Sequence, residues 1–350
     1  MPYITESRRR KSGGSAAKVL TALVIGLLIM INAATAALLL RTGAALQDAI
    51  TAAAVRTDES VDEEFSEPVI PVSVMLDFAE RDGISIEFLQ RFFTDRIVLW
   101  DQSKLKTVPI NNALKKSSFN AAHIVAQENG IRTYEPGGED ISLLGIDVSS
   151  YQGVINWKKV KAAGVDYAII RLGYRGYGTG SIRLDDRYAA NMSGAAAAGV
   201  PVGVYFYSQA VTVEEAEEEA AFVLEKLSGY DVAYPVVFDM EEVDDADART
   251  NALTRAERTG ITVAFCEKIK AAGYTPMVYG NIRWMIMHLD LTRLEDYDKW
   301  FAQYFKQPFF PYDFTMWQYT SRGTIDGIAG AVDLNLGLVD YAGSDTANAA

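Results

Sequence analysis

The sequence is poor in the residues that most enzymes use as nucleophiles or metal ligands. Its 350 residues include one cysteine, Cys266, and two histidines, His123 and His288. A single cysteine excludes an intrachain disulfide, and the helical pattern around Cys266 favours a buried structural thiol. The histidines lie far apart and neither has a partner at metal-ligand spacing, which weakens zinc-hydrolase, Ser-His-Asp and Cys-His interpretations. We therefore expect carboxylates to be the catalytic groups, with no metal and no cofactor.

Positive charge is also scarce. The chain has 33 Lys and Arg against 46 Asp and Glu, a net charge of −13. Since phosphate binding needs a basic surface, nucleic acid is not expected as a partner. Apolar residues make up 49% of the chain, enough for a sizeable core. The length suggests about two domains.

One long uncharged run lies near the N-terminus. Residues 19–40, VLTALVIGLLIMINAATAALLL, carry no charge, and about 20 such residues span the ~30 Å hydrocarbon core of a bilayer. The basic cluster Arg8–Lys11 predicts that residues 1–18 form a cytoplasmic tail and that the rest of the chain lies outside a cell membrane crossed once. The alternative is a signal peptide cleaved after the small residues Ala34–Ala36, which would leave the protein secreted. A buried soluble helix is the third interpretation.

The region between this run and residue 140 has no assignable motif. Residues 41–71 are Ala-rich and then acidic, as expected for a helical extension and a solvated linker. Residues 72–140 are interpreted as a small juxtamembrane module for spacing and support, ending at the turn-rich stretch Tyr134–Asp140. Within it the patterns predict a helix at SIEFLQRFF (85–93), a strand at RIVLWD (96–101) and a short helix at KKSSFNAAHIVAQENG (115–130).

From residue 141 to 343 short β-rich runs alternate with helical patterns, followed by a tail at 344–350. Eight strands are predicted, at 143–149, 165–174, 201–208, 234–240, 275–281, 299–304, 314–319 and 331–335. Helices are predicted between the first five, at 155–164, 187–199, 212–227 and 254–273. Nearly continuous apolar strands alternating with helices indicate a parallel sheet covered by helices. The fold class is therefore α/β, an eight-stranded TIM-like β/α barrel, irregular where short links join its last three strands.

The active site of such a barrel lies at the carboxyl ends of its strands. The residues predicted there are Asp147, Arg171, Tyr174, Tyr205, Tyr207, Asp239, Glu241, Tyr279, Gln303, Trp317, Gln318 and Asp333. The stretch GYRGYGTG (173–180) lacks the order of a phosphate-binding loop, and we expect it to be a flexible loop at the rim.

Carboxylates, amides and aromatic side chains together suit a sugar. Cleavage of a glycosidic bond needs an acid on the leaving oxygen and a second group across an oxocarbenium-like centre. Asp239 and Glu241 are two residues apart, so on a strand both would reach the cleft while Met240 packs behind. Crowding of like charges raises at least one pKa. We assign Glu241 as proton donor and expect Asp239, Asp147 and Asp333 to stay ionised.

Other acids have simpler interpretations. Glu242, Asp244, Asp245 and Asp247 are expected in a solvated loop or at the start of the next helix. The stretch EEAEEEA (214–220) predicts an exposed helix face. Tyr205 and Tyr207 have a second interpretation as core residues.

Several of these stretches resemble the family 25 glycoside hydrolases, lysozymes with an irregular β/α barrel. The resemblance rests on GIDVSSYQG, GVYFYSQAVTVEEAEEEA, VVFDMEE, WFAQY and MWQYTSRGTIDGIAGAVDLN, in order over about residues 141–340. It implies an acid at Glu241, its partner at Asp239, and further aspartates at Asp147 and Asp333. The family usually has lysine on the second strand, where this chain has Arg171.

The resemblance implies cleavage of the β-1,4 bond between N-acetylmuramic acid and N-acetylglucosamine in peptidoglycan. The stereochemical course is open between inversion by separated carboxylates and assistance by the substrate acetamido group. No wall-binding repeats are visible, so the anchor is expected to localise the enzyme. The alternatives are a non-catalytic wall-binding scaffold and a hydrolase of another N-acetylated bacterial polysaccharide.

Overall fold

The computed structural model describes residues 85–343. The predicted segments 1–18, 19–40, 41–71 and 344–350 lie outside these residues. Within residues 85–343, no helix is both long enough and apolar enough to cross a membrane. The described residues all fall within one compact unit, Pro71–Ala350.

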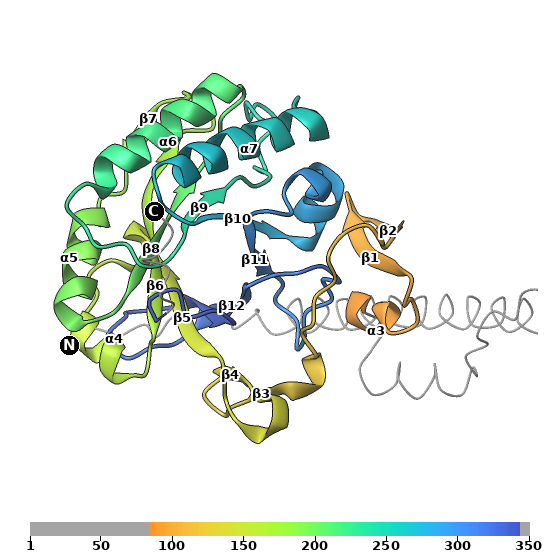
Figure 1. Ribbon diagram of the computed structural model, residues 1–350, viewed down its shortest axis with the longest axis horizontal. Coiled ribbons are helices and arrows are strands. Elements are labelled where there is room, and N and C mark those ends of the chain that lie inside the picture. Colours follow the sequence, from red (N-terminus) through yellow and green to blue (C-terminus); the bar gives the residue numbers. More distant parts are fainter. Residues whose placement is uncertain (1–84, 344–350) are drawn as a thin grey trace, which may run out of the picture. The chain divides into compact units, whose positions relative to one another are not determined.

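The predicted eight-stranded barrel is confirmed (Figure 1). Neighbouring strands pair in the order β5-β13-β12-β11-β10-β9-β8-β6, and pairing of β5 with β6 closes the ring. One short strand, β7 (Ile182–Leu184), was not predicted from the sequence, and it forms a hairpin with β6. The barrel strands are β5 (Leu143–Val148), β6 (Tyr167–Arg175), β8 (Val202–Tyr207), β9 (Val236–Asp239), β10 (Pro276–Asn281), β11 (Asp298–Ala302), β12 (Met316–Gly323) and β13 (Val332–Gly337).

One strand differs in direction from the predicted parallel sheet. β13 runs antiparallel to both of its neighbours, β12 and β5. The chain between Gly323 and Val332 is shorter than the dozen or more residues that a parallel crossover requires, so the strand has to return in the opposite direction. Asp333 therefore lies at the start of β13 and not at its end. The reversal brings it to the same rim as the carboxyl ends of the parallel strands.

The four predicted helices are confirmed and lie outside the barrel (Figure 1). They are α4 (Trp157–Ala162), α5 (Tyr188–Ala198), α6 (Val213–Leu227) and α7 (Arg255–Ala271). Side chains of Asn156, Thr212 and Thr254 accept hydrogen bonds from the first-turn amides of α4, α6 and α7, as N-caps do. The stretch after β10 contains only a π-helix, η5 (Trp284–His288), and a 3-10 turn, η6 (Leu291–Arg293). The links from β11 to β12 and from β12 to β13 hold no helix, which confirms the irregularity expected at the last three strands.

One prediction about α6 is wrong in part. Glu219, within the stretch assigned to an exposed helix face, is fully buried. Its carboxylate pairs with Arg175 and accepts a hydrogen bond from Ser208.

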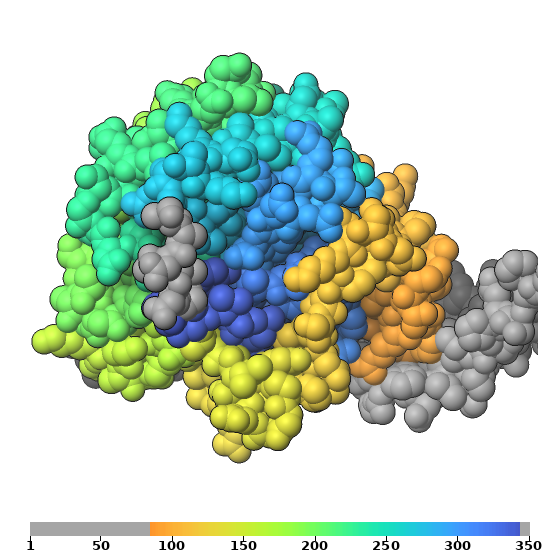
Figure 2. Space-filling model, viewed as in Figure 1, coloured from red at the N-terminus to blue at the C-terminus, as the bar shows by residue number. Residues whose placement is uncertain are grey.

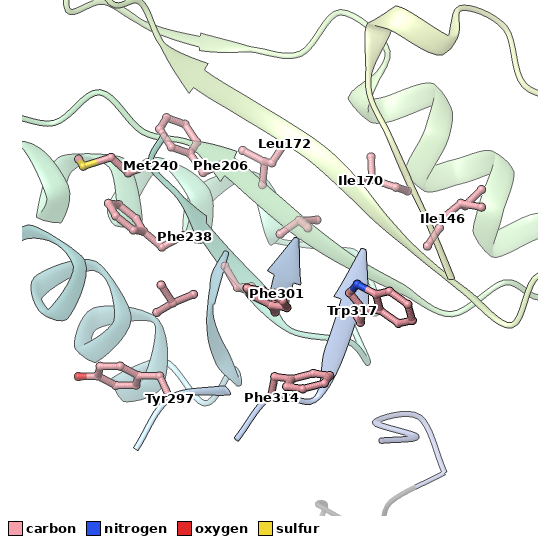
Figure 3. Packing of buried hydrophobic residues seen from close by; sticks show 14 of the residues in the cluster. Ile146, Ile170, Leu172, Phe206, Phe238, Met240, Tyr297, Phe301, Phe314 and Trp317 are labelled. Carbon is pink, nitrogen blue, oxygen red and sulfur yellow. The ribbon is translucent and has the colours of Figure 1, made fainter. Parts of the chain in front are cut away.

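Side chains alternate across the barrel wall, as the two-residue period of a strand requires. Figure 3 shows part of the outer layer, between the strands and the helices, with Ile146, Ile170, Phe206 and Phe238. The intervening residues form a second cluster inside the barrel: Tyr167, Ile169, Tyr234, Val237, Met277, Tyr279, Trp300, Ala302, Met316 and Tyr341. Beyond this inner cluster, at the carboxyl ends of the strands, the inward-facing residues are polar. These polar residues form the candidate site.

Residues 85–140, here called the N-terminal module, form short elements. The predicted helix and strand are confirmed as α3 (Ile86–Gln90) and β1 (Arg96–Asp101), and β1 pairs with β2 (Lys104–Pro109). The helix predicted at 115–130 is wrong. That stretch holds a 3-10 turn, η2 (Ala121–His123), and β3 (Ile124–Ala126), which pairs with β4 (Arg132–Tyr134). The β-branched pair Ile124-Val125 and the following Asn-Gly turn favour this hairpin over a helix.

The N-terminal module packs directly on the barrel (Figure 2). The Tyr312 hydroxyl accepts a hydrogen bond from the amide of Asn111 at 2.8 Å. Arg132 donates to the carbonyl of Phe305 at 2.5 Å, and its guanidinium lies 5.0 Å from the ring of Trp317. The module therefore covers the outer side of β12 and the segment that follows β11.

Candidate active site

The carboxyl end of the barrel holds a cleft of about 830 Å³. It brings together all four predicted catalytic carboxyls and four of the predicted binding residues. These are Asp147, Asp239, Glu241 and Asp333, with Arg171, Tyr174, Tyr205 and Tyr207.

Strand register explains why the four carboxyls meet. Asp147 on β5 and Asp333 on β13 are direct cross-strand partners, which places their Cβ atoms about 4.5–5.5 Å apart. Asp239 is the last residue of β9 and pairs in register with Tyr207 on β8. Glu241 lies two residues beyond and also lines the cleft, while Met240 is buried in the outer layer as predicted.

The carboxylate of Asp147 is held by two amides. Its Oδ2 accepts hydrogen bonds from Nε2 of Gln318 at 2.9 Å and Nδ2 of Asn335 at 2.8 Å. The Oε1 of Gln318 accepts from the hydroxyls of Tyr279 and Tyr304. Gln318 is 3% exposed and orients Asp147, and its predicted contact with substrate stays a prediction. Asn335 was missed, although it lies two residues after Asp333 on the same face.

Burial is the main influence on the carboxyls that face the barrel interior. It raises the pKa of Asp147 well above its usual range, and the charge of Asp333 adds to this, against the lowering effect of the two amides. Burial also raises the pKa of Asp239, with additional effects from Glu241 and Asp147, opposed by the positive charge of Arg171. The buried Oδ1 of Asp239 has no hydrogen-bond partner within the described chain.

The two outer carboxyls are shifted in the same direction. Burial, followed by the charge of Asp333, raises the pKa of Glu241 to about 7. Burial raises the pKa of Asp333 to about 6. The predicted upward shift is confirmed, but its largest cause is burial and not crowding of charge.

Burial therefore acts against the ionised form at all four carboxyls, and the predicted ionisation of the three aspartates stays a prediction. Two N–H donors favour the ionised form of Asp147. The buried Oδ1 of Asp239 accepts no hydrogen bond, so the ionised form of Asp239 lacks the stabilisation that the two amides give Asp147.

Arg171 is fixed beside the carboxyls by an ion pair. Its guanidinium contacts Oδ2 of Asp185 at 2.7 Å and donates to the Ser150 hydroxyl at 3.0 Å. The same group lies 5.0 Å from the ring of Tyr151 and 5.5 Å from that of Tyr174. No sequence pattern indicated Asp185, because its role depends on the unpredicted hairpin of β6 and β7.

Two exposed aromatic side chains lie at the rim of the cleft, and neither was predicted as a site residue. Tyr151 is 86% exposed and Tyr177 is 47% exposed, and both line the cleft. Tyr151 lies in the 3-10 turn η4 (Ser150–Gln152), which is fixed by reciprocal hydrogen bonds between Ser149 and Gln152. Gly153 ends this turn at a φ of 66°, a conformation that favours glycine. The predicted rim position of GYRGYGTG is confirmed, because Gly176–Thr179 line the cleft.

The remaining predicted residues do not line this cleft. Tyr279 and Gln303 line a neighbouring cavity of about 460 Å³ that also borders Glu241. Trp317 faces neither cavity, which contradicts the prediction that it contacts substrate. It is fully buried in the outer layer (Figure 3), and its Nε1 donates to the carbonyl of Gln303. Adjacent strand residues point to opposite faces, so Trp317 and Gln318 cannot both face inward.

Among residues 85–343, no group of three or more His, Cys, Asp or Glu is arranged to hold a metal ion. Cys266 is buried, as predicted, and burial raises the pKa of its thiol.

A closed β/α barrel with clustered carboxyls at the strand ends and an aromatic rim is an arrangement typical of glycosidases. The profile of the glycosyl hydrolases family 25 matches residues 146–328, more than half of the chain. The chain therefore belongs to glycosyl hydrolase family 25.

Several characterised proteins are similar to this region. Lysozyme M1 of Streptomyces globisporus is 28% identical over 210 residues, covering 55% of this chain and 66% of that protein. The autolytic lysozyme of Clostridium acetobutylicum is 24% identical over 197 residues, covering 55% of this chain and 54% of that protein. The modular autolysin LytC of Streptococcus pneumoniae has a solved structure with a TM-score of 0.53 and 26% identity, covering 70% of this chain and 57% of that one. The chain thus spans less than two thirds of the length of each of these relatives.

Proposed function

We propose that the protein hydrolyses the β-1,4 bond between N-acetylmuramic acid and N-acetylglucosamine in peptidoglycan, in remodelling of the cell wall. The observation that carries the proposal is the convergence of Asp147, Asp239, Glu241 and Asp333 in one cleft of a family 25 barrel. The names of two relatives, both lysozymes, support the same reaction. LytC has also been solved with a synthetic peptidoglycan ligand.

In this proposal Glu241 is the general acid. It gives its proton to the leaving glycosidic oxygen while the bond from that oxygen to the anomeric carbon breaks. The ionised carboxylate of Asp147, held by Gln318 and Asn335, stabilises the positive charge that develops on the sugar ring. Asp239 and Asp333 orient the attacking water or the 2-acetamido group.

The aromatic rim supports a carbohydrate substrate. Tyr151, Tyr174 and Tyr177 offer ring faces to pyranose rings, and Arg171 offers its remaining N–H groups to ring substituents. Because the Arg171 guanidinium is already fixed by Asp185, it needs little reorganisation to bind a sugar.

The product of digestion tests the proposal. Purified peptidoglycan treated with the protein should yield muropeptides that end in a reducing N-acetylmuramic acid, identified by mass spectrometry after reduction with borodeuteride. A reducing N-acetylglucosamine would assign a different bond. Binding to the wall without any product would favour the scaffold.

We also propose that residues 19–40 anchor the protein in the cell membrane, with the catalytic domain outside. The uncharged run and the preceding Arg8–Lys11 cluster support this. Sequencing of the N-terminus of the mature, membrane-fractionated protein tests it. A start at Ala37 would contradict the anchor and indicate secretion.

A further inference from the structure

The second cavity is built from two parts of the chain. The N-terminal module contributes Leu99 and Trp100 from β1, and the barrel contributes Tyr279, Gln303 and Tyr304. The matched family region covers residues 146–328. The wall that β1 provides therefore lies outside the sequence that this chain shares with the family profile.

Glu241 borders both cavities. The cleft also contains Asp147, Arg171 and Tyr207, whereas the second cavity contains Trp100 and shares none of these residues. A polymer that places its scissile bond at Glu241 continues in both directions from that bond. The second cavity is therefore positioned to receive the part of the polymer on the far side of Glu241.

Trp100 differs from the other tryptophans. The described residues include all five, and Trp157, Trp284, Trp300 and Trp317 are buried. Trp100 is 55% exposed, and Tyr304, which lines the same cavity, is 52% exposed. A large apolar ring left in water at the wall of a cavity offers a flat surface for a ligand ring.

The strand that carries Trp100 is fixed to the barrel beside the acid. Arg283 on the barrel donates from Nε to Oδ1 of Asp101 at 2.9 Å, and its Nη1 pairs with Glu242. One guanidinium thus links the residue after Trp100 to the residue after Glu241. The wall and the acid are held in one arrangement without a ligand.

The lining of the cavity suits the neutral hydroxyl and acetamido groups of a sugar. Its cation, Arg283, is already paired with two carboxylates. Asn281 and Gln303 add amide groups to the lining, which can hydrogen-bond hydroxyl or acetamido groups. These features suit an N-acetylated sugar and not a phosphate or another strong anion.

We propose that the N-terminal module supplies a saccharide subsite in which Trp100 is the platform for a pyranose ring on the far side of Glu241. The proposal rests on the proposed function, because the ligand is the glycan that the cleft cleaves. It gives the module a role in substrate binding in addition to spacing. Binding is measured apart from hydrolysis, so the two proposals fail separately.

The test uses the full chain with Glu241→Gln in every variant, to prevent turnover. The probe is a soluble hexasaccharide of alternating N-acetylglucosamine and N-acetylmuramic acid, and Kd is measured by calorimetry. Trp100→Ala should raise Kd by about tenfold, equal to about 1.4 kcal/mol, whereas Trp100→Tyr should keep most of the affinity. The matched control is Val125→Ala, at a residue of the same module that is 42% exposed and lines neither cavity, and it should leave Kd unchanged.

Fluorescence gives a second readout. The hexasaccharide should shift the tryptophan emission of the parent to shorter wavelength, because Trp100 leaves water, and Trp100→Tyr should lose this shift. A Kd for Trp100→Ala within twofold of the parent, with no emission shift in the parent, would overturn the subsite. If the wild type failed to cleave peptidoglycan but the Trp100 dependence of binding held, the subsite would stand and the hydrolase proposal would fall.

Discussion

Glu241→Gln should lower the rate of peptidoglycan hydrolysis at pH 6 by at least about 10², since general acid catalysis contributes roughly 10²–10⁴. Glutamine has nearly the same shape as glutamic acid but has no acidic proton for the leaving oxygen. Because the pKa of Glu241 is raised to about 7, the wild-type acid still carries its proton at pH 6. The measurement is release of reducing ends from purified peptidoglycan, with Asp244→Asn, an exposed acid of the same loop that lines neither cavity, as the matched control. Equal rates for the wild type and Glu241→Gln would remove Glu241 from the mechanism.

The same pKa sets the pH dependence of the reaction. The wild-type rate should fall as pH rises through about 7, because Glu241 then loses the proton that it donates. The negative charge of Asp333 contributes to this raised pKa. Asp333→Asn should therefore move the alkaline limb of the profile to lower pH, in addition to any loss of rate. An alkaline limb that stays in place would show that another group controls it.

Stability measurements separate loss of chemistry from loss of fold. A carboxyl whose pKa is raised by folding contributes stability that is complete below its unfolded pKa of about 4.3 and is lost as pH rises through the folded value. For Glu241 that interval ends at about 7. Glu241→Gln should therefore have a free energy of unfolding at pH 8 at least equal to that of the wild type. An inactive variant that was also unstable at pH 8 would not support the assigned role.

Much of the barrel could be predicted because its strands are buried on both faces. Runs such as AIIRL and PVVFD are nearly continuous and apolar, and Gly164, Gly199 and Gly273 end helices in the left-handed conformation. The carboxyl ends of these strands then predicted Asp147, Asp239 and Glu241 as residues of the site. These predictions depended on local sequence alone.

What could not be predicted depends on contacts between distant residues. Asp147 accepts a hydrogen bond from the side-chain amide of Gln318, which is 171 positions away in the sequence. Trp100 lines the cavity beside Glu241 only because the N-terminal module packs on the barrel. The assignment of Trp317 to the cleft is a different kind of error. The two-residue period of β12 already required that Trp317 and Gln318 face opposite ways.

A buried ion pair behind the rim gives the second large expected effect. Nε of Arg175 donates to Oε1 of Glu219 at 2.6 Å, with the two side chains 4% and 0% exposed. Glu219→Ala would leave the guanidinium buried with only the half-exposed Glu218 and carbonyl groups as partners. Removing one member of such a pair costs about 3–5 kcal/mol. We expect a loss of this size in the free energy of unfolding, measured by urea denaturation at pH 8.

Two comparisons make this expectation specific. Glu218→Ala removes a carboxylate that is 63% exposed and also bonded to Arg175, and it should cost no more than about 1 kcal/mol. The double variant Arg175→Leu with Glu219→Leu removes both charges and should be more stable than Glu219→Ala. If Glu219→Ala cost no more than Glu218→Ala, the pair would not be supporting the fold.

The burial of Glu219 is indicated by a pattern in the sequence. The buried residues Ala216, Ala220, Val223 and Leu227 recur at helical spacing along α6, and Glu219 falls on the same stripe. An acid on an apolar stripe has to be paired, because an unpaired buried charge is too costly. Its partner Arg175 also donates to the carbonyl of Gly180, next to the rim residues Gly176–Thr179. Loss of Glu219 should therefore disturb the rim of the cleft as well as the core. Substrate affinity should fall together with the free energy of unfolding.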